Sequence, residues 1–365
     1  MAEKWFYLST LKGRQAEYGA LAELDPETSR RVTPLIQLWP GNTGNDGSVL
    51  QQFWPDEGED AVSGSLIKQL LEKVKDTWSP DRPVLLDGEW LAGAAAFKGV
   101  LAASRAFGRK PVPVTGLGRS DAYQNVIAES IALDHLGCVL RLVRDDFRDD
   151  FAQRLEAFLS RLGLPPSEID VVLDLGHLER QYLERDEIFA ASMIRSLPHL
   201  QDWRNLVLVA SAAPASARGF QPNGIEPYPR LEWWLWQLLQ ERADSLDRLP
   251  TFGDYGVIHP DRVEESANPR ALPRVPQIRY TGESECLVVR GLDLNKHDAD
   301  HVPPLFRQLI KRDEWCGHKY SAAERWIADV AQGNQKVGNG MVWKRVGTVH
   351  HWTFVIQQLA NRSAP

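Results

Sequence analysis

The sequence has 365 residues, of which 43% are hydrophobic and 25% are charged, a mix that suits a globular protein with a sizeable core. Its formal net charge of −7 argues against non-specific binding of nucleic acid, which needs a basic surface. Its three cysteines are too few and too irregularly spaced for a disulfide framework or a cysteine zinc site. The sequence has neither a run of about 18 apolar residues nor a signal-peptide core, so we expect a soluble, cytoplasmic protein that does not enter a membrane.

Eight short apolar runs, each of the length of a strand, lie in the first 256 residues. They cover residues 4–9, 31–38, 83–87, 111–116, 137–143, 169–174, 205–210 and 251–256. Most are continuous rather than alternating, as is typical of strands covered on both faces. Helical patterns separate them. They lie at about 10–24 and 65–78, in a segment that ends near 108, in a segment that begins near 120, and at about 147–162, 184–199 and 230–245. The segment 40–59, rich in Gly, Asn and Asp, is expected to be a long loop.

A strand followed by a helix, repeated seven or eight times, predicts a parallel sheet. No Gly-x-Gly-x-x-Gly follows the first strand, so an open dinucleotide-binding sheet would lack its fingerprint. We therefore predict an α/β fold, a (β/α)8 TIM-barrel-like parallel barrel that residues 251–256 complete. An open parallel sheet remains the alternative.

The pattern changes after residue 260. Residues 277–281 and 285–291 predict an antiparallel β-hairpin, and helical patterns follow at about 302–313, 321–331 and 349–362. We expect a single domain over residues 1–365. Its parts are the barrel in 1–257, a hairpin insertion on the barrel mouth in 258–300, and helices that close the barrel wall in 301–365.

Residues at the carboxyl ends of barrel strands point into the barrel mouth, where such folds hold their sites. Four acids at these positions are candidate catalytic groups: Asp254, Asp174, Asp87 and Glu17. Acids in a ring with basic groups can bind a polar ligand, hold a divalent cation or perform acid–base chemistry. The alternative is that these charges pair structurally with one another, and that Glu17 caps the first helix.

Seven further residues are candidate ligand-binding groups: Lys12, Arg14, Arg141, Tyr255, Arg279, Tyr280 and His351. Lys12 and Arg14 follow the first strand, where they suit an anionic ligand. A Schiff-base role for Lys12 would need a depressed pKa in an apolar pocket. Asp254 and Tyr255 lie between two glycines, so this segment either presents a site or forms a turn whose aspartate caps local amides.

Two predictions concern helical side chains. His350 and His351 diverge by about 100° around a helix, so both are not expected to bind one metal ion. Trp233 and Trp236 share a helix face, whereas Trp234 points elsewhere and is a candidate exposed anchor for a protein partner. No P-loop, nucleophile elbow or zinc signature is present, so neither a metal nor a cofactor is assigned.

Several segments, taken in order, resemble the beta family of proteins found in bacteria, prophages and satellite phages. They are Leu11-Lys12 with Arg14 and Glu17, then residues 32–37, 252–256, 279–281 and 343–351. The resemblance covers nearly the whole chain and implies a role beside neighbouring gene products in mobile-element or defence systems. Gln37 stands where the family pattern usually has glutamate, which counts against a catalytic role.

We therefore consider two classes of function. The first is a binding or regulatory component of a mobile-element or anti-phage defence system, which acts through a protein partner encoded nearby; a homo-oligomer is left open. The second is a TIM-barrel enzyme with an acid-lined mouth, a hydrolase of a phosphate-containing or other polar ligand. It would use the four acids with Arg141, Lys12 and Arg279. The lack of a dedicated catalytic motif, together with Gln37, favours the first.

Overall fold

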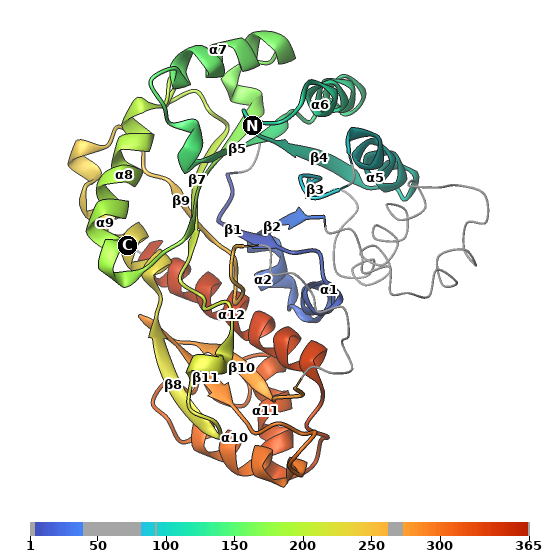
Figure 1. Cartoon of the computed structure of the whole chain (residues 1–365), viewed down its shortest axis with the longest axis vertical. Helices are drawn as coiled ribbons and strands as arrows, with labels where there is room; N and C mark the ends of the chain where they lie inside the picture. Colours follow the sequence, from blue (N-terminus) through green and yellow to red (C-terminus); the bar gives the residue numbers. More distant parts are fainter. Residues whose placement is uncertain (1–3, 39–81, 92, 262–272, 364–365) are drawn as a thin grey trace.

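The computed structural model describes residues 4–38, 82–91, 93–261 and 273–363 (Figure 1). Eight parallel strands form a closed barrel in the order β1-β2-β3-β4-β5-β6-β7-β9, which confirms the predicted fold. The strands are β1 (Tyr7–Leu11), β2 (Val32–Gln37), β3 (Pro83–Asp87), β4 (Lys110–Thr115), β5 (Cys138–Val143), β6 (Ile169–His177), β7 (Asn205–Ser211) and β9 (Thr251–Asp254).

Helices connect the barrel strands and cover the outside of the barrel (Figure 1). They are α1 (Gln15–Glu23), α2 (Pro26–Arg31), α5 (Ala94–Ala106), α6 (Asp121–Asp134), α7 (Phe151–Leu162), α8 (Leu183–Ser196) and α9 (Leu231–Glu241). Ser120 caps α6, because its side chain accepts a hydrogen bond from the Tyr123 amide. The predicted loop 40–59 and helix 65–78 lie outside the described residues.

The first strand begins and ends later than its sequence pattern indicates. β1 pairs with β2 from Tyr7 opposite Val32 to Leu11 opposite Ile36, so residues 10 and 11 belong to the strand and not to the following helix. Gly13 then turns the chain with φ of 63°, a conformation that favours glycine. The shift places Lys12 directly at the carboxyl end of β1, in the barrel mouth.

The barrel interior is a packed core rather than a channel. Its buried side chains come from β1 to β7 and from Tyr255, which directly follows β9; they include Leu8, Leu35, Leu85, Val112, Val114, Val139, Val172, Val207 and Val209. The packing leaves no room at Gly253, where an added Cβ would lie 2.8 Å from Val209 Cγ2 and 2.9 Å from Val207 Cγ1. Glycine at position 253 thus lets β9 close the ring between β7 and β1.

A second, smaller sheet lies beside the barrel. It is antiparallel, has the order β10-β11-β8, and consists of β8 (Gly224–Pro229), β10 (Gln277–Thr281) and β11 (Glu285–Arg290). The predicted hairpin is therefore confirmed as β10 and β11. The sequence analysis missed β8, which lies at the edge of this sheet and contains Pro227 and Pro229. Proline is tolerated on an edge strand because one side of the strand needs no ladder hydrogen bonds.

The C-terminal helices differ from the prediction that all of them close the barrel wall. Helices α10 (Val302–Ile310) and α11 (Ala322–Gln332) contact each other, and α10 packs on β8 and β11 of the small sheet. Only α12 (Gly340–Ser363) runs between the two parts, where it contacts α1 and α2 on one side and β10 and α11 on the other (Figure 1). Within the described residues, no helix has both the length and the apolar character needed to cross a bilayer.

The tryptophan cluster of α9 is part of the core. Trp233 and Trp236 share a face as predicted, with ring centroids 5.2 Å apart, and both meet Phe252 of β9 edge-on. Trp234 is half-buried against the core, and the Arg180 guanidinium lies 5.5 Å from its ring centroid. Trp234 is therefore not the exposed anchor that the sequence suggested.

Candidate functional site

The barrel mouth is occupied by an ion-pair network centred on Arg141 of β5. Its Nε donates to Asp174 Oδ2 at 2.7 Å, and its Nη1 donates to Asp87 Oδ2 at 3.0 Å. Its Nη2 donates to the hydroxyl of Tyr255 at 2.9 Å, and that hydroxyl in turn donates to Asp174 Oδ2 at 2.5 Å. Two of the candidate catalytic acids thus bind the same buried guanidinium.

Three more side chains, those of Arg119, Glu89 and Gln37, belong to this network. Arg119 contacts Glu89 Oε1 at 2.7 Å and Asp87 Oδ1 at 3.3 Å. The Gln37 amide, oriented so that both of its polar atoms are satisfied, accepts from Arg141 Nη1 at 2.6 Å. A glutamate at position 37 would add another carboxylate beside Arg141, whereas Gln37 places a neutral acceptor there.

The network holds Arg141 in its charged form. Burial opposes the charge, but Tyr255, Asp174 and Asp87 outweigh it and raise the pKa of Arg141. The side chains of Asp87 and Asp174 are at most 2% exposed, and arginines occupy their carboxylates. Asp87 and Asp174 are therefore paired with arginine side chains, which is the structural alternative that the sequence left open for them.

A second buried cluster surrounds Asp254 at the end of β9. Its carboxylate accepts hydrogen bonds from the Tyr7 hydroxyl, from the Gly256 amide at 2.8 Å and from His351 Nε2 at 2.9 Å. His351 Nδ1 lies 2.8 Å from the Thr281 hydroxyl, which donates to it. Asp254 and His351, which the sequence assigned to separate roles, thus form one pair that joins the barrel to β10 through α12.

The pKa shifts in this cluster define the protonation of the pair. Burial acts to raise the pKa of Asp254, but His351 and the hydrogen bonds from Tyr7 and Gly256 lower it below its ordinary value. Burial lowers the pKa of His351 and outweighs the attraction of Asp254. We therefore assign a carboxylate beside a neutral imidazole, whose Nε2–H donates to Asp254 and whose Nδ1 accepts from Thr281.

His350, the neighbour of His351, faces α11 and the small sheet. Its Nδ1 lies 2.5 Å from Glu324 of α11, and its Nε2 lies 2.8 Å from the carbonyl oxygen of Thr281. The ring of Tyr280 stacks on it with centroids 3.7 Å apart. The two histidines use different partners, as their divergence on a helix requires. Tyr280, a candidate ligand-binding residue, is fully buried in this packing.

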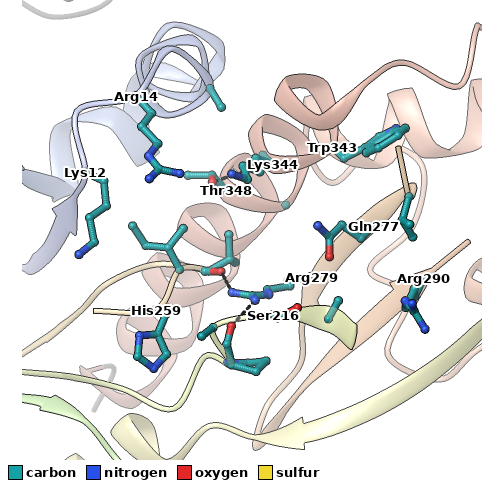
Figure 2. Close-up of a pocket in the computed structure, with 18 of the residues that line it drawn as sticks. Lys12, Arg14, Ser216, His259, Gln277, Arg279, Arg290, Trp343, Lys344 and Thr348 are labelled. Atoms are coloured by element: carbon teal, nitrogen blue, oxygen red, sulfur yellow. Dashed lines mark hydrogen bonds between the residues drawn. The ribbon is translucent and has the colours of Figure 1, made fainter. Parts of the chain in front are cut away.

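A cavity of about 350 Å³ lies between the barrel mouth, the small sheet and α12 (Figure 2). Among the residues that the structure describes, six cationic side chains from both parts of the protein line it: Lys12, Arg14, Arg218, Arg279, Arg290 and Lys344. The described part of the lining has two carboxylates, those of Glu17 and Asp261. The chain as a whole is acidic, so this cavity is a local concentration of positive charge.

The backbone holds several of these groups in place. Arg279 of β10 donates to the carbonyl oxygens of Val257 and Pro214 from its two terminal nitrogens. Glu17 accepts hydrogen bonds from the amides of Lys12 at 3.2 Å and Arg14 at 2.9 Å, which is the capping role considered above. Burial raises the pKa of Glu17, although both amides act to lower it. Glu17 thus shapes the turn that presents Lys12 and Arg14 to the cavity.

Sequence reasoning identified half of the cationic lining, namely Lys12, Arg14 and Arg279, and missed Arg218, Arg290 and Lys344. The missed residues lie on the segment before β8, on β11 and on α12, and no sequence motif marks them. Among the described residues, no group of three or more His, Cys, Asp or Glu side chains is placed to hold a metal ion.

The family model of the Beta protein matches residues 7–357, nearly the whole chain. The chain belongs to the Beta protein family. No curated protein matches it. The segments that carried the family resemblance meet at two places in this Beta protein. Residues 252–256, 279–281 and 343–351 form the buried cluster of Asp254, Thr281 and His351, whereas Lys12, Arg14 and Glu17 lie at the cavity.

Proposed function

We propose that this Beta protein is a cytoplasmic binding component that holds a small phosphate-bearing ligand in the cavity between the barrel and the small sheet. The observation that supports this proposal is that the described part of the lining has six cationic side chains and two carboxylates. Arginine and lysine bind phosphate oxygens through charge-assisted hydrogen bonds, which gain strength in a partly enclosed site. A volume of about 350 Å³ falls in the range of small-molecule pockets.

The position of the cavity favours a regulatory role. Lys12 and Arg14 belong to the barrel, whereas Arg279 and Arg290 belong to the small sheet, so a ligand that contacts both sets fixes one part relative to the other. A partner protein that recognises both parts would then bind the occupied and empty forms with different affinity. We propose that this partner is encoded nearby, in the mobile-element or defence setting that the family resemblance implies.

The second candidate is a hydrolase of the same kind of ligand. The acid-lined mouth supplies its general acids and bases, but Arg141 binds both Asp87 and Asp174, and Asp254 is 1% exposed beside His351. Catalysis by these acids would require the ion pairs to open. The cationic cavity needs no such rearrangement to bind an anion, and for this reason we rank binding first.

Calorimetric titration with inorganic pyrophosphate tests the proposal. Lys344 and Arg218 are exposed residues of the lining, so Lys344→Gln and Arg218→Gln remove cavity charge without opening the core. Each is expected to weaken binding about tenfold, the equivalent of roughly 1.4 kcal/mol. Lys98→Gln is the matched control, because Lys98 is 62% exposed on α5 and contacts Glu129 outside the cavity.

The outcomes separate the candidates. No binding of pyrophosphate, or equal weakening by Lys98→Gln, contradicts a ligand site in this cavity. Release of phosphate from a nucleoside triphosphate supports the hydrolase instead if Asp174→Asn abolishes it at an unchanged melting temperature.

A further inference from the structure

Lys12 has surroundings unlike those of the other lysine in the cavity lining. Its Nζ lies 4.4 Å from the centroid of the Trp90 ring and 5.7 Å from that of Tyr255. Within the part of the chain that the structure describes, its hydrogen-bond acceptors are main-chain carbonyls, those of Pro260 and Asp261, and no carboxylate lies within ion-pair distance. The residue is only 4% exposed, whereas Lys344 is exposed at the far wall.

The aromatic rings and carbonyl oxygens favour the ammonium form of Lys12, but its burial and the nearby arginines oppose it. Burial, followed by the positive charges of Arg141 and Arg14, lowers the pKa of Lys12 to about 8, although Glu17 and Asp174 act in the opposite sense. At pH 7.5, about a quarter of Lys12 is then the neutral amine, compared with about one part in a thousand for an ordinary lysine. The neutral, nucleophilic fraction is thus on the order of 200-fold larger.

We infer that Lys12 is a carbonyl-reactive amine, and that the cavity takes a phosphate-bearing aldehyde or ketone which Lys12 holds as an imine. The inference rests on the proposed function, because Arg14, Arg279 and Lys344 would bind the phosphate and bring the carbonyl group to Lys12. Figure 2 shows Lys12 and His259 on one side of the cavity, with Arg14 next to Lys12 and Lys344 farther along the cavity. The amine and the phosphate-binding groups therefore suit different ends of one ligand.

The reaction needs no oxidant or reductant. The lone pair of neutral Nζ adds to the carbonyl carbon, the C=O π bond opens onto the oxygen, and a proton passes from the nitrogen to that oxygen, which gives a carbinolamine. Its hydroxyl group then takes up a proton and leaves as water, while the nitrogen loses its remaining proton and the C=N bond forms.

His259 suits a role as hydrogen-bond donor to the carbonyl oxygen. Burial, followed by the nearby His177, lowers the pKa of His259 and favours its neutral ring. Its Nδ1 accepts from the Asp261 amide at 3.2 Å, so the neutral ring carries its hydrogen on Nε2.

Reductive trapping tests the inference on the whole chain. The protein is incubated with pyridoxal 5′-phosphate as the probe, reduced with sodium borohydride, and mapped by peptide mass spectrometry. At pH 7.5 we expect Lys12 to be labelled at least about tenfold faster than Lys98, an exposed lysine of the same molecule. Labelling of Lys12 should be half-maximal near pH 8, pyrophosphate should compete with it, and pyridoxal without phosphate should react more slowly.

Lys12→Arg provides the matched variant, because it keeps the positive charge but cannot form an imine. It should lose the label from this peptide, whereas the slower labelling of Lys98 should be unchanged. If pyrophosphate binds the unmodified protein but Lys12 is labelled no faster than Lys98, the imine is ruled out and the phosphate site stands. If neither pyrophosphate nor the probe binds, both this inference and the proposed function fail.

Discussion

Asp254→Asn tests whether the family motif at residues 252–256 holds the fold together. The carboxylate accepts from the Tyr7 hydroxyl, the Gly256 amide and His351 Nε2. The asparagine NH₂ group must replace one of the two oxygens and will therefore face at least one hydrogen-bond donor. A hydrogen bond to a charged group contributes about 1.5–3 kcal/mol. We expect the free energy of unfolding to fall by about 1.5–3 kcal/mol, because the neutral imidazole of His351 leaves no uncompensated charge behind.

Urea unfolding at pH 7.5, followed by tryptophan fluorescence, measures this loss. The matched control is Asp121→Asn, since the Asp121 side chain is 89% exposed and pairs with Arg161 at the surface. Such a pair contributes about 0–1 kcal/mol, so the control should unfold close to the wild type.

One result would refute the structural reasoning. If Asp254→Asn is as stable as Asp121→Asn but loses an activity of the protein, then Asp254 acts on a substrate and its hydrogen bonds contribute little to folding. The barrel mouth would in that case become the catalytic centre that the acids first suggested.

Three further predictions concern the same framework. Arg141→Met leaves two buried carboxylates without their shared counter-charge and should lower the free energy of unfolding by about 3–5 kcal/mol. Its control, Arg105→Met, removes an arginine from a more exposed pair and should lower the free energy of unfolding by about 0–1 kcal/mol. In Gly253→Ala the new methyl group lies under 3 Å from two valine side chains, so the free energy of unfolding, measured by thermal melting, should fall by about 1–3 kcal/mol. In the control Gly118→Ala the methyl group enters open space, and the stability should change little. Because the pKa of His351 is lowered from its ordinary 6.5, the unfolded chain binds a proton that the folded one does not. Stability should therefore fall as the pH drops below 6.5, and this slope should weaken in His351→Gln.

The barrel could be predicted because its strands carry a strong signal. Each is a nearly continuous apolar run, a pattern that both the packed interior and the covering helices require. β8 carries no such signal, since its sequence Gly-Ile-Glu-Pro-Tyr-Pro has few apolar residues and two prolines. Only its pairing with β11, more than fifty residues later in the chain, makes it a strand.

The types of residue in the site could be predicted from the sequence, but the ion pairs between these residues could not. Strand ends correctly placed Asp87, Arg141 and Asp174 in the barrel mouth, yet nothing in the sequence indicates that one guanidinium binds both acids. That outcome depends on the side-chain lengths and on the stagger of neighbouring strands. The cationic cavity was harder to predict than the ion pairs, because Arg290 and Lys344 reach it only through the docking of the small sheet and α12 against the barrel.

The link between Asp254 and His351 bears on how the protein matures during synthesis. The two residues are 97 positions apart, so a ribosome that has just finished β9 has not yet made the imidazole that this carboxylate needs. A nascent barrel at that stage would bury the carboxylate without one of its hydrogen-bond donors, which opposes its closure. The ring is therefore expected to close only after α12 emerges, and nascent chains that end before residue 351 should be open to proteases and dependent on chaperones.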